Sequence, residues 1–173
     1  MGVKMWELLL DLEQAAAAAG VPSDRGKLAE GLAPFAEQFA SCPLEIRTTS
    51  LPEDAREVSF RFVDESAHGE LWPIARRWYR VGGEPAAFLD AVYERMEVRA
   101  EGIDADVRRG FRKVWAFLTL GHRAERFAAM PGVPAALAPS IATLEKHGLQ
   151  HLSIVGIDPA SRTLNLYPML APG

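Results

Sequence analysis

The sequence predicts an α+β fold in which pairs of helices alternate with pairs of antiparallel strands. Strand pairs are expected to begin near residues 44, 97 and 150, at an interval of about 53 residues. Two helical segments precede each pair, so helix, helix, strand, strand recurs three times. The last hairpin, residues 151–167, shows the pattern most clearly. We therefore expect three α-α-β-β repeats.

Helices are expected where apolar residues recur at three- and four-residue spacing. The segments are about 3–19, 25–41, 70–80, 85–96, 121–129 and 134–147. Pro34 is expected to kink or split the second helix, because proline lacks an amide donor. Strands are expected where apolar and polar residues alternate. They are 44–50, 56–63, 97–103, 111–120 and the two arms of 151–167.

Turns are expected where aspartate, proline and glycine gather between these elements. The predicted turns lie at 51–54, from 104 to 106 and at 158–161. In the last of them, Asp158 can accept hydrogen bonds from backbone amides two residues further on. The motif Asp104-Ala105-Asp106 resembles a metal-diphosphate pair, but its position between strands favours a plain turn.

Each strand pair offers one apolar face and one mixed face. Val58, Phe60 and Phe62 should lie under the helices, as should Leu164 and Leu166. If the sheet curls into an antiparallel β-barrel or half-barrel ringed by helices, the other face becomes a polar lumen. Its residues are Glu57, Ser59, Arg61, Lys113, Trp115, Phe117, Asn165 and Tyr167. Such a lumen suits a ligand with an anionic end and an apolar body. A half-exposed sheet with a solvated outer face fits the same pattern.

Composition bounds the function classes. The chain has 173 residues, 49% hydrophobic and 24% charged, as expected for a single globular domain over residues 1–173. The net charge of −4 argues against nucleic-acid binding. One cysteine suits the cytoplasm, and charged residues interrupt the apolar run 1–19, so neither a signal peptide nor a membrane span is expected. Basic clusters at 76–80 and 108–113 could serve a small anion.

Four stretches carry a resemblance to a known family. They are Arg56–Phe62, Gly110–Phe117, Met130–Gly132 and Thr163–Tyr167, and their order and spacing match as well. In these stretches the sequence resembles the ABBA aromatic prenyltransferases of soil bacteria. The resemblance implies a ten-stranded antiparallel barrel, of which this chain matches the first six strands. It also implies transfer of a dimethylallyl or geranyl group from its diphosphate to an aromatic small molecule.

The resemblance assigns residues to the diphosphate. The protein must hold the leaving group with cations and hydrogen-bond donors. Lys113 and Asn165 fall on positions that contact the diphosphate. Ser59 stands where magnesium-dependent members carry an aspartate, so no metal or other cofactor is expected. Arg61, two residues on along the same face, would replace the ion.

The resemblance also assigns residues to the prenyl group and the acceptor. Aromatic faces stabilise an allylic cation through their quadrupole. Trp115 and Tyr167 fall on walls of the prenyl pocket, and Phe117 shares their face. Ser153 falls near the aromatic acceptor, and Arg162 is a further substrate-binding candidate in the last turn.

Six strands in an open sheet leave two unpaired edges, which proteins usually avoid. A homodimer would remove them if a second copy paired with both edges to close a twelve-stranded barrel. Two alternatives fit the same sequence. The chain could be a non-catalytic barrel that binds an aromatic or isoprenoid ligand, or a truncated fragment of a prenyltransferase.

Overall fold

The computed structural model describes residues 4–49, 56–66, 69–119, 122–133, 135 and 137–169. Its helices are α1 (Met5–Ala18), α2 (Arg25–Leu32), α3 (Leu71–Trp78), α4 (Gly83–Arg95), α5 (Glu125–Ala128) and α6 (Leu137–Lys146). Two short 3-10 turns, η1 (Ala33–Phe35) and η2 (Gln38–Ala40), follow α2. The strands are β1 (Leu44–Thr48), β2 (Val58–Asp64), β3 (Val98–Asp106), β4 (Gly110–Leu118), β5 (His151–Asp158) and β6 (Thr163–Met169).

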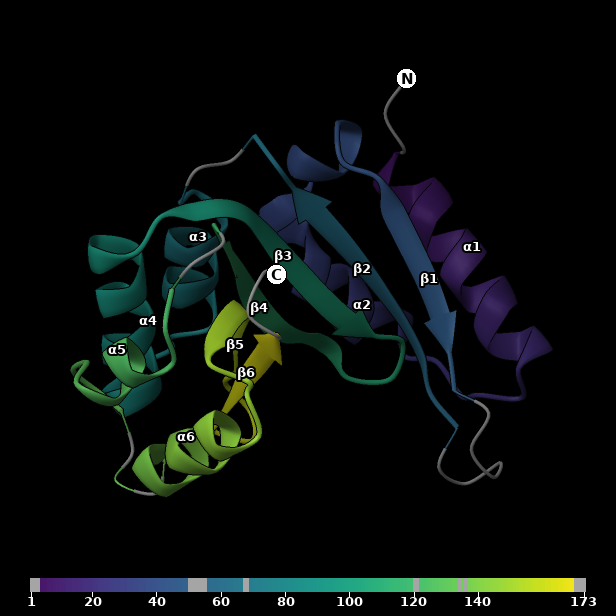
Figure 1. Ribbon diagram of the computed structural model, residues 1–173. Coiled ribbons are helices and arrows are strands. Elements are labelled where there is room, and N and C mark those ends of the chain that lie inside the picture. The colour runs from purple at the N-terminus through teal and green to yellow at the C-terminus, as the bar shows by residue number, and fades with distance from the viewer. Residues whose placement is uncertain are drawn as a thin grey trace. The chain divides into compact units, whose positions relative to one another are not determined.

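The strands follow one another in the sheet in chain order, β1-β2-β3-β4-β5-β6 (Figure 1). An α+β fold with antiparallel strand pairs is therefore confirmed, and β1 and β6 are the end strands of an open sheet in the part of the chain described. The chain divides into two compact units. Unit 1 holds residues 1–64 and 102–113, and unit 2 holds residues 65–101 and 114–173.

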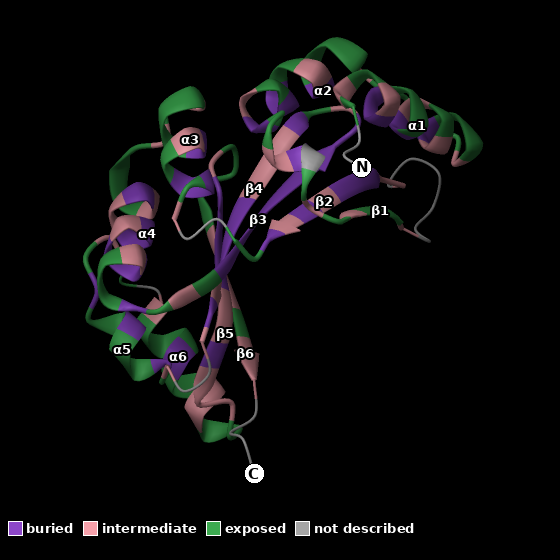
Figure 2. Cartoon of the chain, turned by 90° about the horizontal axis from the view of Figure 1, so that it is seen from above, coloured by how far each residue is buried: buried purple, intermediate pink, exposed green. Residues whose placement is uncertain are grey.

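Unit 1 has an aromatic core between its helices and β2. Phe60 and Phe62 are fully buried, and both pack edge-on against Phe39 with ring centroids 6.0 and 4.8 Å away. Phe35 tilts against Phe62 at 5.9 Å. Figure 2 shows α1 and α2 on one side of β1 and β2. The prediction that the apolar face of β2 lies under the helices is therefore confirmed.

The second predicted helix ends sooner than expected. Asp24 caps α2 by accepting a hydrogen bond from the Lys27 amide at 3.0 Å. α2 stops at Leu32, and the rest of the predicted 25–41 segment forms η1 and η2. Pro34 lies inside η1 and has no amide to continue the α-helical pattern. The predicted split of the second helix at Pro34 is therefore confirmed.

Two glycines seat α2 directly on the start of β4. A Cβ atom at Gly31 would lie 2.6 Å from the Phe111 nitrogen, and one at Gly110 would lie 2.5 Å from the Lys27 carbonyl oxygen. Both clashes are with backbone, which has no side-chain freedom to yield. Gly110 also has a φ of 76°, in the left-handed region that favours glycine. A side chain at either position would part the helix from the strand.

Unit 2 contains a buried carboxylate that replaces a helix cap. Glu101 of β3 is fully buried. Its oxygens accept hydrogen bonds from the amides of Leu71 and Trp72, at 3.0 and 3.1 Å, at the start of α3. The Tyr93 hydroxyl of α4 donates to the same carboxylate. Glu101 thus ties two helices to the sheet, satisfying amides that helix geometry leaves unpaired.

The third strand is longer than predicted. Asp104, Ala105 and Asp106 were expected in a turn, but all three belong to β3, and the turn is formed by residues 107–109. The turn expectation was wrong because it rested on the local preference of aspartate, while pairing within the sheet decides this segment. Of the other predicted turns, 51–54 lies outside the described residues. At 158–161, Asp158 accepts bonds from the amides of Ala160 and Ser161, each at 3.1 Å, as predicted.

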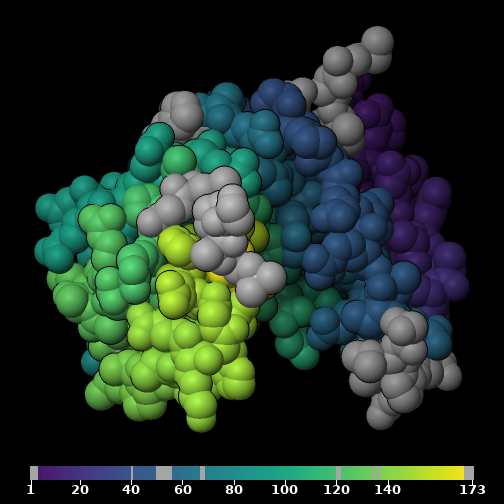
Figure 3. Space-filling model, in the orientation of Figure 1, coloured from purple at the N-terminus to yellow at the C-terminus, as the bar shows by residue number. Residues whose placement is uncertain are grey.

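The end strands differ from the centre of the sheet in exposure. Residues 45–48 of β1 are all exposed, and Figure 3 shows this blue segment at the surface. Leu164 and Leu166 of β6 are half-buried rather than fully covered. In the described residues, no helix is long and apolar enough to cross a membrane.

Candidate functional site

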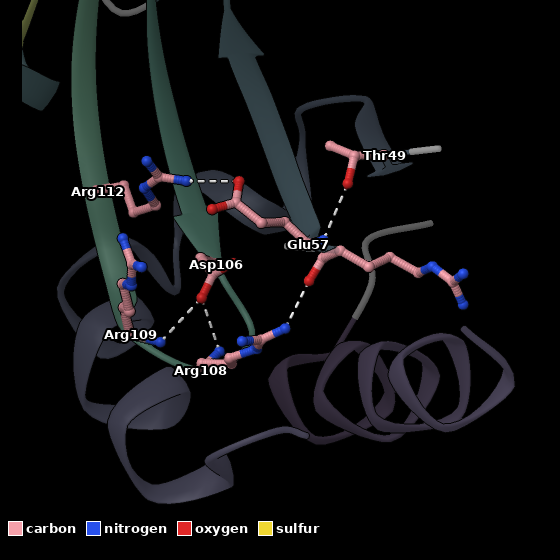
Figure 4. A network of polar contacts seen from close by, with 7 residues as sticks. Thr49, Glu57, Asp106, Arg108, Arg109 and Arg112 are labelled. Carbon is pink, nitrogen blue, oxygen red and sulfur yellow. Dashed lines mark hydrogen bonds and ion pairs between the residues drawn. The ribbon is translucent and has the colours of Figure 1, made fainter. Parts of the chain in front are cut away.

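The turn between β3 and β4 is fixed by a carboxylate. Asp106 is buried, and its Oδ1 accepts hydrogen bonds from the amides of Arg108 and Arg109 at 2.9 and 3.1 Å (Figure 4). The Arg108 guanidinium reaches the Arg56 carbonyl oxygen. These contacts set the start of β4, the strand that carries Arg112 and Lys113.

Strand register brings charged residues of β1 and β2 together. Arg47 lies directly opposite Ser59, and Glu45 lies opposite Arg61. Residues paired in this way project from the same face of an antiparallel sheet. The Arg61 guanidinium is 4.0 Å from the Glu45 carboxylate. Arg47 was not among the predicted site residues, because its strand is short and lacks a clear alternation.

Strand β4 adds two more cations. The Arg112 guanidinium donates to Glu57 at 3.1 Å, which Figure 4 shows. Lys113 is half-buried. Neither Lys113 nor Arg47 forms an ion pair with any described residue, whereas Arg61 and Arg112 are paired. We call Arg47, Arg61, Arg112 and Lys113 the basic cluster.

Asp104 of β3 lies within electrostatic range of this cluster. It is 6% exposed, and its Oδ1 is buried without a hydrogen-bond partner among the described residues. Burial raises the pKa of its carboxyl above the usual range. The positive charges of the basic cluster lower the same pKa, and the residues that carry them are Arg61, Arg47, Arg112 and Lys113. All of these residues belong to unit 1.

Unit 2 holds an aromatic group composed of Trp115, Phe117 and Tyr167. The Trp115 ring lies 6.3 Å from Phe117 and 6.3 Å from Tyr167, edge-to-face in both pairs. Trp115 is opposite Gly156, which is opposite Asn165. A Cβ atom at Gly156 would collide with the Trp115 ring, so glycine gives that ring its place over β5. Nothing in the sequence pattern alone indicates this role for Gly156.

The aromatic group has a hydrogen-bond donor beside it. The Asn165 side-chain nitrogen is buried and has no hydrogen-bond partner in the described part of the chain. Strand β4 contributes to both sets of residues, Lys113 to the basic cluster and Trp115 to the aromatic group. The first set has the chemistry to bind an anion, and the second has the chemistry to bind an apolar or cationic group.

A sequence profile for the family described as aromatic prenyltransferase Orf2 matches residues 4–172. The chain belongs to this family. The match extends over nearly all of the sequence, so the resemblance seen in four short stretches is confirmed.

Relatives within the family are moderately similar. The chain is 25% identical over 174 residues to the 5,10-dihydrophenazine-1-carboxylate 9-dimethylallyltransferase of Streptomyces anulatus, covering 95% of this chain and 57% of the relative. It is 27% identical over 170 residues to the flaviolin linalyltransferase of Streptomyces virginiae, covering 93% and 55%. The chain spans about half the length of the curated relatives it matches.

Two residues that the family resemblance assigned to substrate have other local roles. The Ser153 hydroxyl donates to the Tyr167 carbonyl oxygen at 3.1 Å, bridging β5 and β6. Arg162 is exposed, has a φ of 54°, and lines a cavity of about 600 Å³ with Arg80 and the start of α4. A second cavity, of about 440 Å³, is lined by Trp72, Pro73, Arg76, Arg77, Arg80, Val81 and Asp90. Among the predicted site residues only Arg162 lines either of these cavities.

The described residues contain no group of three or more His, Cys, Asp or Glu side chains placed to hold a metal ion. Ser59 is buried on β2, opposite Arg47. An arginine therefore stands across from the position at which the family resemblance places the aspartate of magnesium-dependent members.

Proposed function

We propose that this protein transfers a prenyl group, dimethylallyl or geranyl, from its diphosphate to an aromatic small molecule. The observation that supports this most directly is the basic cluster, in which Arg47 and Lys113 remain without ion pairs among the described residues. Uncommitted cations on a strand face favour an anionic ligand such as a diphosphate. Family membership supplies the reaction class.

In the proposed reaction the bond between the prenyl carbon and the diphosphate oxygen breaks, and the electron pair leaves with the diphosphate. Lys113, Arg61 and Arg47 offset the charge that develops on the leaving oxygens. The allylic cation is attacked by an aromatic carbon, which then loses its proton. The rings of Trp115, Tyr167 and Phe117 stabilise the positive charge through their faces, and Asn165 donates a hydrogen bond to the diphosphate.

We further propose that the reaction needs no metal ion. Ser59 offers no carboxylate, and the guanidinium groups of Arg47 and Arg61 provide positive charge on its face. Ser153 is proposed to lie near the aromatic acceptor, and Arg162 is proposed as a weaker candidate for the substrate-binding charge that replaces the ion. Cytoplasmic location is also a proposal, supported by the single cysteine.

We propose that the protein acts as one domain and as a homodimer. Strands β1 and β6 each have one sheet neighbour in the part of the chain described, so each offers an edge with which a second copy could pair. Static light scattering on a size-exclusion column tests this directly. A mass of twice 19.0 kDa is expected, and a monomer at micromolar concentration would contradict it.

The activity is tested by incubating the protein with dimethylallyl or geranyl diphosphate and a panel of hydroxyaromatics, with and without EDTA. Product is expected in both conditions. Lys113→Ala should lower kcat/KM by roughly 100-fold, because one charge-assisted contact to the leaving group is lost. Lys146→Ala, at the exposed end of α6, is the matched control and should retain full activity.

A second candidate function is non-catalytic binding of an isoprenoid or aromatic ligand. The observation that favours it is the buried side-chain nitrogen of Asn165, which has no hydrogen-bond partner among the described residues and which ligand binding alone would satisfy. Tight binding of a prenyl diphosphate with no product, under conditions where an active relative turns over, would support this function instead.

A further inference from the structure

Asp104 differs from every other carboxylate near the basic cluster. Glu45 and Glu57 pair with Arg61 and Arg112, and Asp106 accepts two backbone amides. Asp104 is buried, yet its Oδ1 has no hydrogen-bond partner among the described residues. Burying a carboxylate without hydrogen bonds costs free energy, so a native protein retains one where it has a further role.

The charges around Asp104 come from every strand of unit 1. Strand β1 contributes Glu45 and Arg47, β2 and the residue before it contribute Arg61 and Glu57, and β4 contributes Arg112 and Lys113. Asp106 lies on Asp104's own strand, held by the turn amides. Arg112 and Arg61 form ion pairs with Glu57 and Glu45, whereas Arg47 and Lys113 form none among the described residues. All four cations act electrostatically on Asp104.

We propose that Asp104 sets the affinity of the basic cluster for diphosphate, by opposing the anion when ionised and donating a hydrogen bond to it when protonated. This rests on the proposed function, because it takes the basic cluster as the diphosphate site. The unpartnered oxygen then has a partner in the complex, an oxygen of the bound anion.

The direction of the effect follows from electrostatics. Burial already raises the pKa of the Asp104 carboxyl. A bound diphosphate adds negative charge beside it and raises that pKa further. Between the two pKa values, binding takes up one proton. The affinity of the protein for diphosphate therefore rises as the pH falls through this range, and the protonated form behaves like a neutral asparagine.

The test is isothermal titration of the full chain with inorganic diphosphate, repeated in buffers of different ionisation enthalpy between about pH 5 and about pH 8. The dependence of the observed heat on the buffer counts the protons exchanged. Asp104→Asn should bind diphosphate about tenfold tighter at the upper end of the range, as expected for removing one charge a few ångströms from an anion. It should also take up about one proton fewer than the wild type where Asp104 titrates.

Glu45→Gln is the matched control, because it removes an exposed carboxylate from the same part of the sheet. It should leave the proton count unchanged. The inference about Asp104 is overturned if Asp104→Asn, folded by circular dichroism, binds more weakly than the wild type or exchanges the same number of protons. If the wild type itself binds no diphosphate, both the inference about Asp104 and the proposed function are wrong.

Discussion

Strand β3 carries three buried carboxylates, and two of them, Glu101 and Asp104, have contrasting surroundings. Glu101 accepts hydrogen bonds from two amides of α3 and from the Tyr93 hydroxyl. Asp104 has cations around it and a buried oxygen without a hydrogen-bond partner in the described residues. Glu101 therefore serves the fold, whereas Asp104 is available to a ligand. Their burial does not distinguish them, because both are buried; their hydrogen-bond partners do.

The difference lies in which groups supply the compensation. At Glu101 the protein itself provides fixed donors, so the carboxylate and the start of α3 stabilise each other. At Asp104 no described residue donates a hydrogen bond to Oδ1, and the attraction of cationic side chains offsets part of the cost of burial. A charge balanced in this way responds when another ion arrives.

Removing the Glu101 carboxylate should have the largest effect on the free energy of unfolding. Glu101→Ala leaves the Leu71 and Trp72 amides and the Tyr93 hydroxyl without their acceptor, and should lower the free energy of unfolding by about 3–5 kcal/mol. Urea denaturation followed by circular dichroism measures this. A loss below about 1 kcal/mol would show that water replaces the carboxylate and that Glu101 is not a structural anchor.

The pH dependence of stability gives a second test of the structural role of Glu101. Burial raises the pKa of Glu101 in the folded state, although its hydrogen bonds act in the opposite direction. The stability that this proton contributes is fully present below the unfolded pKa of about 4.3 and is lost as the pH rises through the folded pKa.

Glu101→Gln removes this titration. The variant should be less stable than the wild type by about 1–3 kcal/mol at low pH, because an amide cannot accept hydrogen bonds at both of its ends. The difference should shrink as the pH rises. Thermal unfolding at several pH values measures it, and a difference that grows with pH would contradict the raised pKa.

The helix cap at Asp24, which is exposed, allows the stability contribution of the buried cap at Glu101 to be compared with that of a surface cap. Asp24 caps α2 from the surface, where water can replace it. Asp24→Ala should cost about 1 kcal/mol, well below the loss for Glu101→Ala. Equal losses in the same denaturation experiment would mean that burial adds nothing to the cap at Glu101.

The second carboxylate should have the smallest effect on the fold. Asp104→Asn removes an unpaired buried charge without changing its shape. The free energy of unfolding should stay the same or increase by up to about 1 kcal/mol. A loss of 2 kcal/mol or more in urea denaturation would place Asp104 with Glu101 among the structural residues.

These two carboxylates also mark where sequence-based prediction succeeded and failed. The face of Phe60 and Phe62 was predicted correctly, because period-two alternation on a buried strand is a local signal. The role of Glu101 was not predicted, since its partners at residues 71 and 72 are about 30 positions away and only the fold brings them together. Asp104 was assigned to a turn because aspartate favours turns locally, and sheet pairing outweighed that preference.

The candidate site shows the same limits. Arg61 and Lys113 were identified from the pattern of their strands and from the family resemblance, and both lie in the basic cluster. Arg47 was missed because only the β1–β2 register places it opposite Ser59. Gly156 was missed because its importance depends on the Trp115 ring across the strand pair.

The glycine contact between α2 and β4 has a consequence for the position of the basic cluster. Gly31 and Gly110 let the helix backbone rest on the strand backbone, so no cushion of side chains separates α2 from the segment that leads into Arg112 and Lys113. A shift of the helix would therefore act directly on the strand that carries those two residues. Substitutions on the outer surface of α2 are expected to change the position of Arg112 and Lys113 only while positions 31 and 110 stay glycine.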